Sequence, residues 1–113
     1  MNNLLNELKF VGYNNTSSVQ MKQGDLTPIF IELLGVKKSL KNSSKEKANL
    51  YLINEDNKVK FNKEFDVAVG QIKLVIDKVL PAGRYLIEVK HEGRIYPSLN
   101  THSIQINTSA DVI

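Results

Sequence analysis

The chain has 113 residues, of which 42% are hydrophobic and 24% charged, a size and composition typical of one globular domain with a single core. It contains no cysteine, which excludes thiol nucleophiles, disulfide bonds and thiolate metal ligands. The formal net charge is only +3, the cations are nearly all lysines, and the apolar runs are short, so we expect neither nucleic acid nor a membrane among the partners.

Residues 1–17 are interpreted as an N-terminal segment that precedes the main domain. Its apolar residues fit one turn of a helix, but the stretch that begins at Leu8 fits a strand equally well. The segment lacks the basic and apolar pattern of a secretory signal, so we expect none. Four of its side chains are candidates for a partner interface, the alternative being that they cover one open end of the domain: Leu4, Leu5, Leu8 and Phe10.

From residue 18 onward, apolar and polar side chains alternate, which predicts β-strands with one buried and one wet face. We expect strands at residues 19–22, 28–34, 48–53, 59–69, 71–77, 84–90 and 103–107. Lys63 interrupts the apolar face of the fourth strand, which indicates an edge strand or a bulge at that point.

Turn and loop signals separate these strands. Residues 54–57 (Asn-Glu-Asp-Asn) predict a four-residue hairpin loop, and Gly93 predicts a tight reversal late in the chain. Residues 35–47 are polar and lysine-rich and are expected to form the longest loop. A role as an anion-binding loop or as a docking surface for acidic groups is less favoured than a solvated loop, because no aromatic or glycine-rich phosphate cradle accompanies the lysines.

The strand and turn spacing predicts an all-β fold, an immunoglobulin-like antiparallel β-sandwich of about seven or eight strands. We place this domain at residues 18–107, with residues 108–113 as a C-terminal tail or linker. Tyr85 follows a Pro-Ala-Gly turn and opens a late strand. Immunoglobulin-like sandwiches often place a tyrosine there whose hydroxyl bonds to nearby backbone, so we assign Tyr85 a structural role at this corner.

The sequence contains no recognisable catalytic constellation. His91 continues the buried face of the Tyr85 strand and His102 lies near a strand start, but neither has a carboxylate at a spacing typical of metal binding or acid–base catalysis. A structural role is therefore favoured for both histidines. We expect no enzymatic activity, no cofactor and no metal site.

The laid-out strands resemble the N-terminal domain of the phage baseplate upper protein family, which occurs in tail fibres of siphophages that infect Gram-positive bacteria. The likeness covers residues 18–107. It is carried by Gly24 and Asp25 with the strand at 29–34, by residues 48–64 as a hairpin, and by residues 70–76 followed by the Leu80 to Tyr85 corner and the hairpin about Gly93.

The resemblance implies an immunoglobulin-like domain that docks a fibre or receptor-binding module to the tail. Its partners would be other virion tail or baseplate proteins, in an oligomer within the assembled particle, located in the virion after assembly in the host cytoplasm. Docking would combine buried apolar side chains with pairing of a sheet edge. The alternative function is a carbohydrate-binding β-sandwich module, for which Tyr13, Tyr51 and Tyr96 are the candidate stacking residues.

Overall fold

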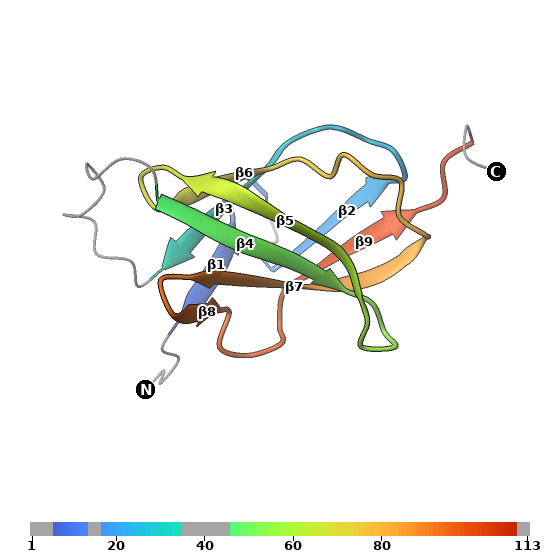
Figure 1. The fold of residues 1–113 in the computed structure, drawn as a ribbon. Helices are drawn as coiled ribbons and strands as arrows, with labels where there is room; N and C mark the ends of the chain where they lie inside the picture. Colours follow the sequence, from blue (N-terminus) through green and yellow to red (C-terminus); the bar gives the residue numbers. More distant parts are fainter. Residues whose placement is uncertain (1–5, 14–16, 35–45, 111–113) are drawn as a thin grey trace.

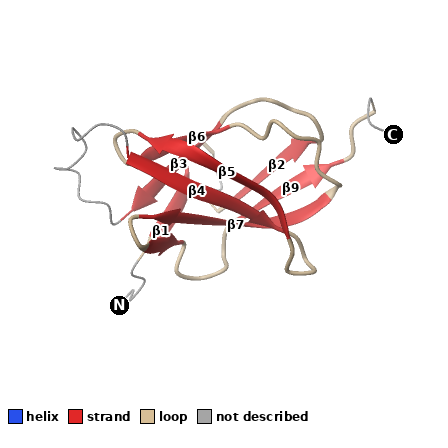
Figure 2. Cartoon of the chain, in the orientation of Figure 1, coloured by secondary structure: helices blue, strands red, loops and turns tan. Residues whose placement is uncertain are grey.

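The computed structural model describes residues 6–13, 17–34 and 46–110, and all regular elements in these ranges are β-strands (Figures 1 and 2). A three-stranded sheet has the order β1-β3-β6, and a six-stranded sheet has the order β2-β9-β7-β4-β5, with β8 paired to β7. The strands are β1 (Glu7–Phe10), β2 (Ser18–Lys22), β3 (Ile29–Leu34), β4 (Glu46–Ile53), β5 (Val59–Val67), β6 (Gln71–Leu74), β7 (Gly83–His91), β8 (Arg94–Tyr96) and β9 (Ser103–Asn107).

One core lies between the two sheets, and it is built from alternate positions on their strands. The small sheet contributes side chains such as Ile31 and Ile72, and the large sheet contributes Leu50, Val89 and Ile104, all of them 0% exposed. Because successive residues of a strand point to opposite faces, this alternation is the structural result of the sequence pattern. The prediction of an all-β, two-layered fold is thereby confirmed.

All seven expected strands are present, and the described residues add two short ones, β1 and β8. Within β5, pairing with β4 continues without a shift through Lys63, which lies opposite Leu50. The expected bulge is instead displaced toward the hairpin, where Leu52 pairs with Phe61 and Ile53 with Val59. Lys60 is therefore the extra residue of this bulge. β5 lies at the edge of the large sheet, so the expectation of an edge strand is confirmed.

The expectation of a purely antiparallel sandwich is wrong for one pair. β2 runs parallel to β9, with Ser18 opposite Ser103 and Lys22 opposite Asn107. Strands joined by a tight hairpin must be antiparallel, but β2 and β9 are far apart in the chain and are free of that constraint. Alternation of side chains reports which face a residue occupies and carries no information on the direction of its neighbour.

The boundary expected at residue 17 also requires correction, because β1 belongs to the sandwich. It pairs antiparallel with β3, so that Leu8 lies opposite Leu33 and Phe10 opposite Ile31. Of the two readings of this stretch, the strand is therefore the observed one. Leu4 and Leu5 lie outside the described residues, as do residues 35–45 of the expected long loop, whose last two positions, 46 and 47, are part of β4.

The hairpin between β4 and β5 closes through one side chain. Asn54 Oδ1 accepts hydrogen bonds from the backbone N–H groups of Asp56 at 3.0 Å and Lys58 at 2.9 Å, and Asn57 adopts a left-handed conformation with a φ of 63°. Asparagine tolerates this conformation and readily bonds the backbone ahead of it, so this loop forms from its own residues. The hairpin at this place is confirmed, but five residues, 54–58, separate β4 from β5 instead of the expected four.

Candidate interaction surface

Leu8 and Phe10, two of the four residues expected at a partner interface, are core residues. Their side chains are 2% and 0% exposed, so neither offers apolar surface to a partner in this fold. The physical reason is that β1 joins the small sheet, which turns these alternate positions inward. The interpretation that they cover one end of the domain is the one that fits their burial.

The segment between β8 and β9 fastens β1 to the rest of the domain. The Ser98 N–H donates to the Asn6 carbonyl at 2.8 Å, and the Asn6 N–H donates to Ser98 Oγ at 2.9 Å. The His102 ring has Nδ1 at 2.9 Å from Thr101 Oγ1 and lies with its centroid 5.9 Å from that of Phe10. Burial lowers the pKa of His102, an effect partly offset by the Leu8 backbone and by Glu7. The arrangement gives His102 a structural role.

Tyr85 occupies the corner that the sequence assigned to it. Its ring is buried, and its hydroxyl donates to the backbone carbonyl of Pro81 at 2.5 Å. Burial raises the pKa of the Tyr85 hydroxyl above its ordinary value, so the group remains a donor well beyond neutral pH. This contact joins the start of β7 to the turn before it.

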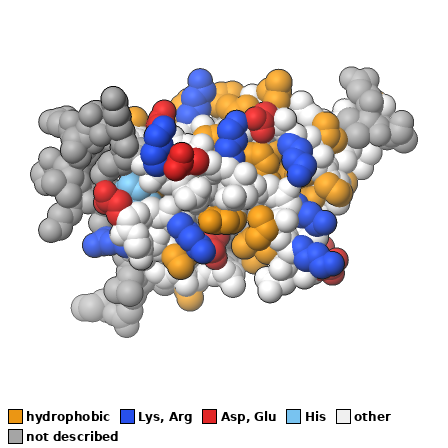
Figure 3. Space-filling view, viewed as in Figure 1, with side chains coloured by type: hydrophobic (Ala, Val, Ile, Leu, Met, Phe, Trp, Pro, Cys, Tyr) orange, Lys and Arg blue, Asp and Glu red, His pale blue; other side chains and the backbone are white. Residues whose placement is uncertain are grey.

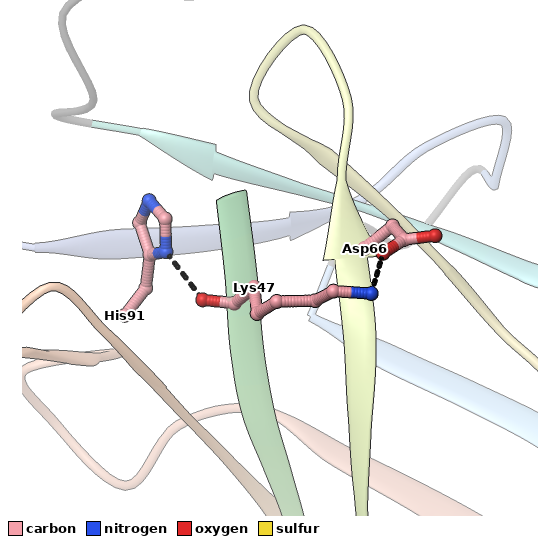
Figure 4. A network of polar contacts seen from close by, with 3 residues as sticks. All are labelled: Lys47, Asp66 and His91. Carbon is pink, nitrogen blue, oxygen red and sulfur yellow. Dashed lines mark hydrogen bonds and ion pairs between the residues drawn. The ribbon is translucent and has the colours of Figure 1, made fainter. Parts of the chain in front are cut away.

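His91 lies in a network that ties three strands of the large sheet together (Figure 4). Its buried ring places Nδ1 at 3.1 Å from the Lys47 carbonyl oxygen on β4, and the Lys47 ammonium group bonds to the Asp66 carboxylate on β5. This pairing raises the pKa of Lys47, mainly through the hydrogen bond to Asp66. Within the described ranges no group of three or more metal-ligating side chains exists, and the geometry around His91 is that of a strand cross-link.

The three tyrosines considered for carbohydrate stacking do not form a common platform. Tyr96 is 0% exposed and packs in the core, whereas the Tyr51 ring is half-buried with the Lys90 ammonium group 5.1 Å from its centroid. Tyr13 is 38% exposed and lies in the turn after β1. Of these rings, Tyr13 alone presents exposed aromatic surface.

The outer face of the large sheet carries an apolar patch beside the β4–β5 hairpin, and we call it the hairpin hollow. Ile53 and Leu86 pair across β4 and β7 and provide apolar surface, and the hollow encloses about 310 Å³. The remaining lining residues are polar or charged: Asn54, Glu55, Asn57 and Arg84. Figure 3 shows this side of the molecule, where hydrophobic surface lies between lysine and arginine side chains.

The hairpin hollow was missed by the sequence analysis, although a signal for it exists. Leu86 and Ile53 are apolar residues at positions where the alternation of their strands calls for a polar, outward-facing side chain. Arg84 lies on the same outward face, two residues before Leu86, and it has no acidic partner among the residues that the structure describes. An unpaired arginine beside apolar surface is a composition typical of the centre of a protein interface.

Comparison with known proteins provides no relative: no model of a protein family matches the chain, and no curated protein matches it. The part of the chain that the structure describes contains no helix that is long and apolar enough to cross a membrane.

Proposed function

We propose that this chain is a structural assembly domain of a phage tail or baseplate, which docks a fibre or receptor-binding module to the tail. The proposal rests on the resemblance described above and on one surface, the hairpin hollow. Ile53 and Leu86 lie on an outward sheet face with Arg84, which has no ion-pair partner among the described residues, and this combination is suited to bury against another protein. The partner would be another virion protein that offers apolar side chains with a carboxylate for Arg84.

We further propose that the sandwich is immunoglobulin-like. Support comes from the strand order: β1, β3 and β6 would correspond to strands A, B and E of that fold, and β9, β7, β4 and β5 to strands G, F, C and C′. The Tyr85 hydroxyl on the Pro81 carbonyl supports the same assignment, because β7 then carries the tyrosine corner at the start of strand F.

A binding assay with assembled particles tests the proposal. Tails purified from the phage that encodes the chain should retain the tagged domain in co-sedimentation. Arg84→Glu should weaken this binding by about tenfold, because it reverses the charge at the centre of the interface. The matched control is Lys73→Glu, the same charge reversal at an exposed position of the small sheet, which should leave binding unchanged.

Two results would overturn the proposal. One is the absence of the chain from purified virions by mass spectrometry, together with neighbouring genes that encode no tail proteins. The other is equal loss of tail binding in Arg84→Glu and Lys73→Glu, which would exclude the hairpin hollow as the docking site.

A further inference from the structure

Apart from the three-residue β8, which pairs only with β7, four strands end the two sheets within the described residues, and three of these edges are protected in identifiable ways. An unprotected edge exposes backbone N–H and C=O groups that can pair with another chain. On β1, the Val11 N–H donates to the Phe30 carbonyl of β3 at 2.8 Å. Because backbone groups alternate between the two sides of a strand, the odd-numbered residues of this stretch bond to β3 and the even-numbered residues direct their backbone groups outward. Of these, Asn6 is bonded to Ser98 through both its carbonyl and its N–H, and the His102 ring lies against Phe10 of β1 with 5.9 Å between the ring centroids.

The edges β5 and β6 lie on the other side of the sandwich, where they close against each other. Lys63 on β5 forms an ion pair with Asp77, just after β6, at 2.6 Å. The Lys78 ammonium group donates to the Lys60 carbonyl at 3.3 Å and so occupies an outward acceptor of β5. Charged side chains that cross an edge in this way block the approach of another strand.

β2 is the fourth edge, and the positions of its backbone groups follow from the hydrogen bonds at its two ends. The Ser17 carbonyl accepts from the Ser103 N–H at 3.1 Å, and the Gln23 N–H donates to the Asn107 carbonyl at 2.9 Å. Because backbone groups alternate between the two sides of a strand, odd-numbered residues bond to β9 and even-numbered residues direct their N–H and C=O groups away from it.

The outward backbone groups of β2 therefore belong to Ser18, Gln20 and Lys22. The Lys22 carbonyl accepts from the Asp25 N–H at 3.2 Å, and no bond to a described residue engages the backbone of Gln20. The Gln20 side chain is turned toward β9, where its Oε1 accepts from Asn107 Nδ2 at 3.4 Å, so it does not cover the edge. Gln20 lies at the centre of an open row of donors and acceptors.

We infer that β2 pairs with β2 of a second copy of this chain, antiparallel and about a twofold axis at Gln20. The two Gln20 residues would then exchange both of their N–H···O bonds, and the two large sheets would continue as one.

The residue pattern of β2 is complementary to itself in this register. Ser18 would lie opposite Lys22 of the second copy, so the one charged residue of the strand meets a neutral hydroxyl rather than another lysine. Val19 would lie opposite Met21 of the second copy, which pairs the two apolar residues on the core-facing side. Charge and polarity thus select a second copy as the occupant of this edge.

Pairing over five residues buries less area than a standard stable interface, so the expected dimer is weak, with association visible at about 0.1–1 mM. This inference does not depend on the proposed function or on the hairpin hollow. Arg84→Glu should accordingly leave self-association unchanged, which keeps a failure of either proposal distinguishable from a failure of the other.

Amide hydrogen exchange and sedimentation equilibrium on the full chain test the inference. With rising protein concentration, the amides of Ser18, Gln20 and Lys22 should gain protection. Those of Val19 and Met21, which already bond to β9, should be protected at every concentration. Gln20→Pro removes an N–H that bonds to no described residue, and it should weaken association by about tenfold or more while the domain stays folded.

Two further variants keep the test decisive. Gln20→Lys retains the backbone donor but sets like charges opposite each other at the axis, so it should also weaken association, whereas Gln20→Ala should leave it nearly unchanged. A chain that stays monomeric at about 1 mM, or a dimer that tolerates both Gln20→Pro and Gln20→Lys, would overturn the inference. Protection of Gln20 that appears only on addition of a different protein would overturn it as well, since the occupant would then be another chain.

Discussion

The hydroxyl of Tyr85 and the carbonyl of Pro81 form a hydrogen bond of 2.5 Å that fastens the first residues of β7 to the turn that precedes them. The contact is local, spanning four residues, and it links the turn to the central strand of the large sheet. The buried ring of Tyr85 packs in the core at the same time, so one side chain serves both the corner and the sandwich interior.

Tyr85→Phe should lower the free energy of unfolding by about 1 kcal/mol, because it leaves the Pro81 carbonyl without its donor and keeps the packing of the ring. Urea unfolding followed by circular dichroism measures this change. Tyr13→Phe is the matched control, since Tyr13 is partly exposed and should tolerate loss of its hydroxyl. Equal stability of wild type and Tyr85→Phe would show that the corner bond contributes nothing.

Phe10→Ala should destabilise the domain by about 3–5 kcal/mol, the usual cost of removing a large aromatic side chain from a packed core. Removal of residues 1–12 should unfold the domain for the same reason, because β1 and its bonds to Ser98 are lost. Thermal unfolding provides the measurement. A truncation variant that stays folded but no longer binds a partner would instead support an interface role for this segment.

The stability of the domain should fall as the pH decreases below about 6.5, the ordinary pKa of histidine. Burial lowers the pKa of His102 in the folded state, so the unfolded chain binds a proton more readily and acid favours unfolding. The contribution is fully present above the unfolded pKa and is lost as the pH falls toward the folded one. Urea unfolding at several pH values measures it.

His102→Gln is the control for this pH dependence, and its unfolding free energy should decline less between pH 7 and pH 5.5 than that of wild type. Titration of the His102 ring by NMR provides an independent check on the same variant series. A folded-state pKa at or above the ordinary value would contradict the prediction.

Asn54→Ala should cost about 1 kcal/mol, because two backbone N–H groups of the β4–β5 hairpin lose their acceptor. Asn54→Asp retains an oxygen at the same place and should restore most of that stability. Chemical denaturation compares the three proteins. Indistinguishable stability of the alanine and aspartate variants would show that the hairpin closes without this side chain.

Features that depend on neighbours along the chain could be predicted from the residues alone. Alternation placed Tyr85, Ile87, Val89 and His91 on one buried face, and the Asn-Glu-Asp-Asn stretch predicted a loop that its own Asn54 closes. Such features can be recognised locally because the pleat of a strand and the conformations of a turn are properties of a few consecutive residues.

The identity of neighbouring strands, and of the side chains that meet between the two sheets, became known from the folded domain. The parallel pairing of β2 with β9, the enclosure of Leu8 and Phe10, and the meeting of Ile53 with Leu86 beneath Arg84 all join segments remote in sequence. A strand with alternating side chains can bury its apolar face beside several different neighbours, in parallel or antiparallel orientation. Packing of the whole core and backbone bonds between distant strands select one of these arrangements.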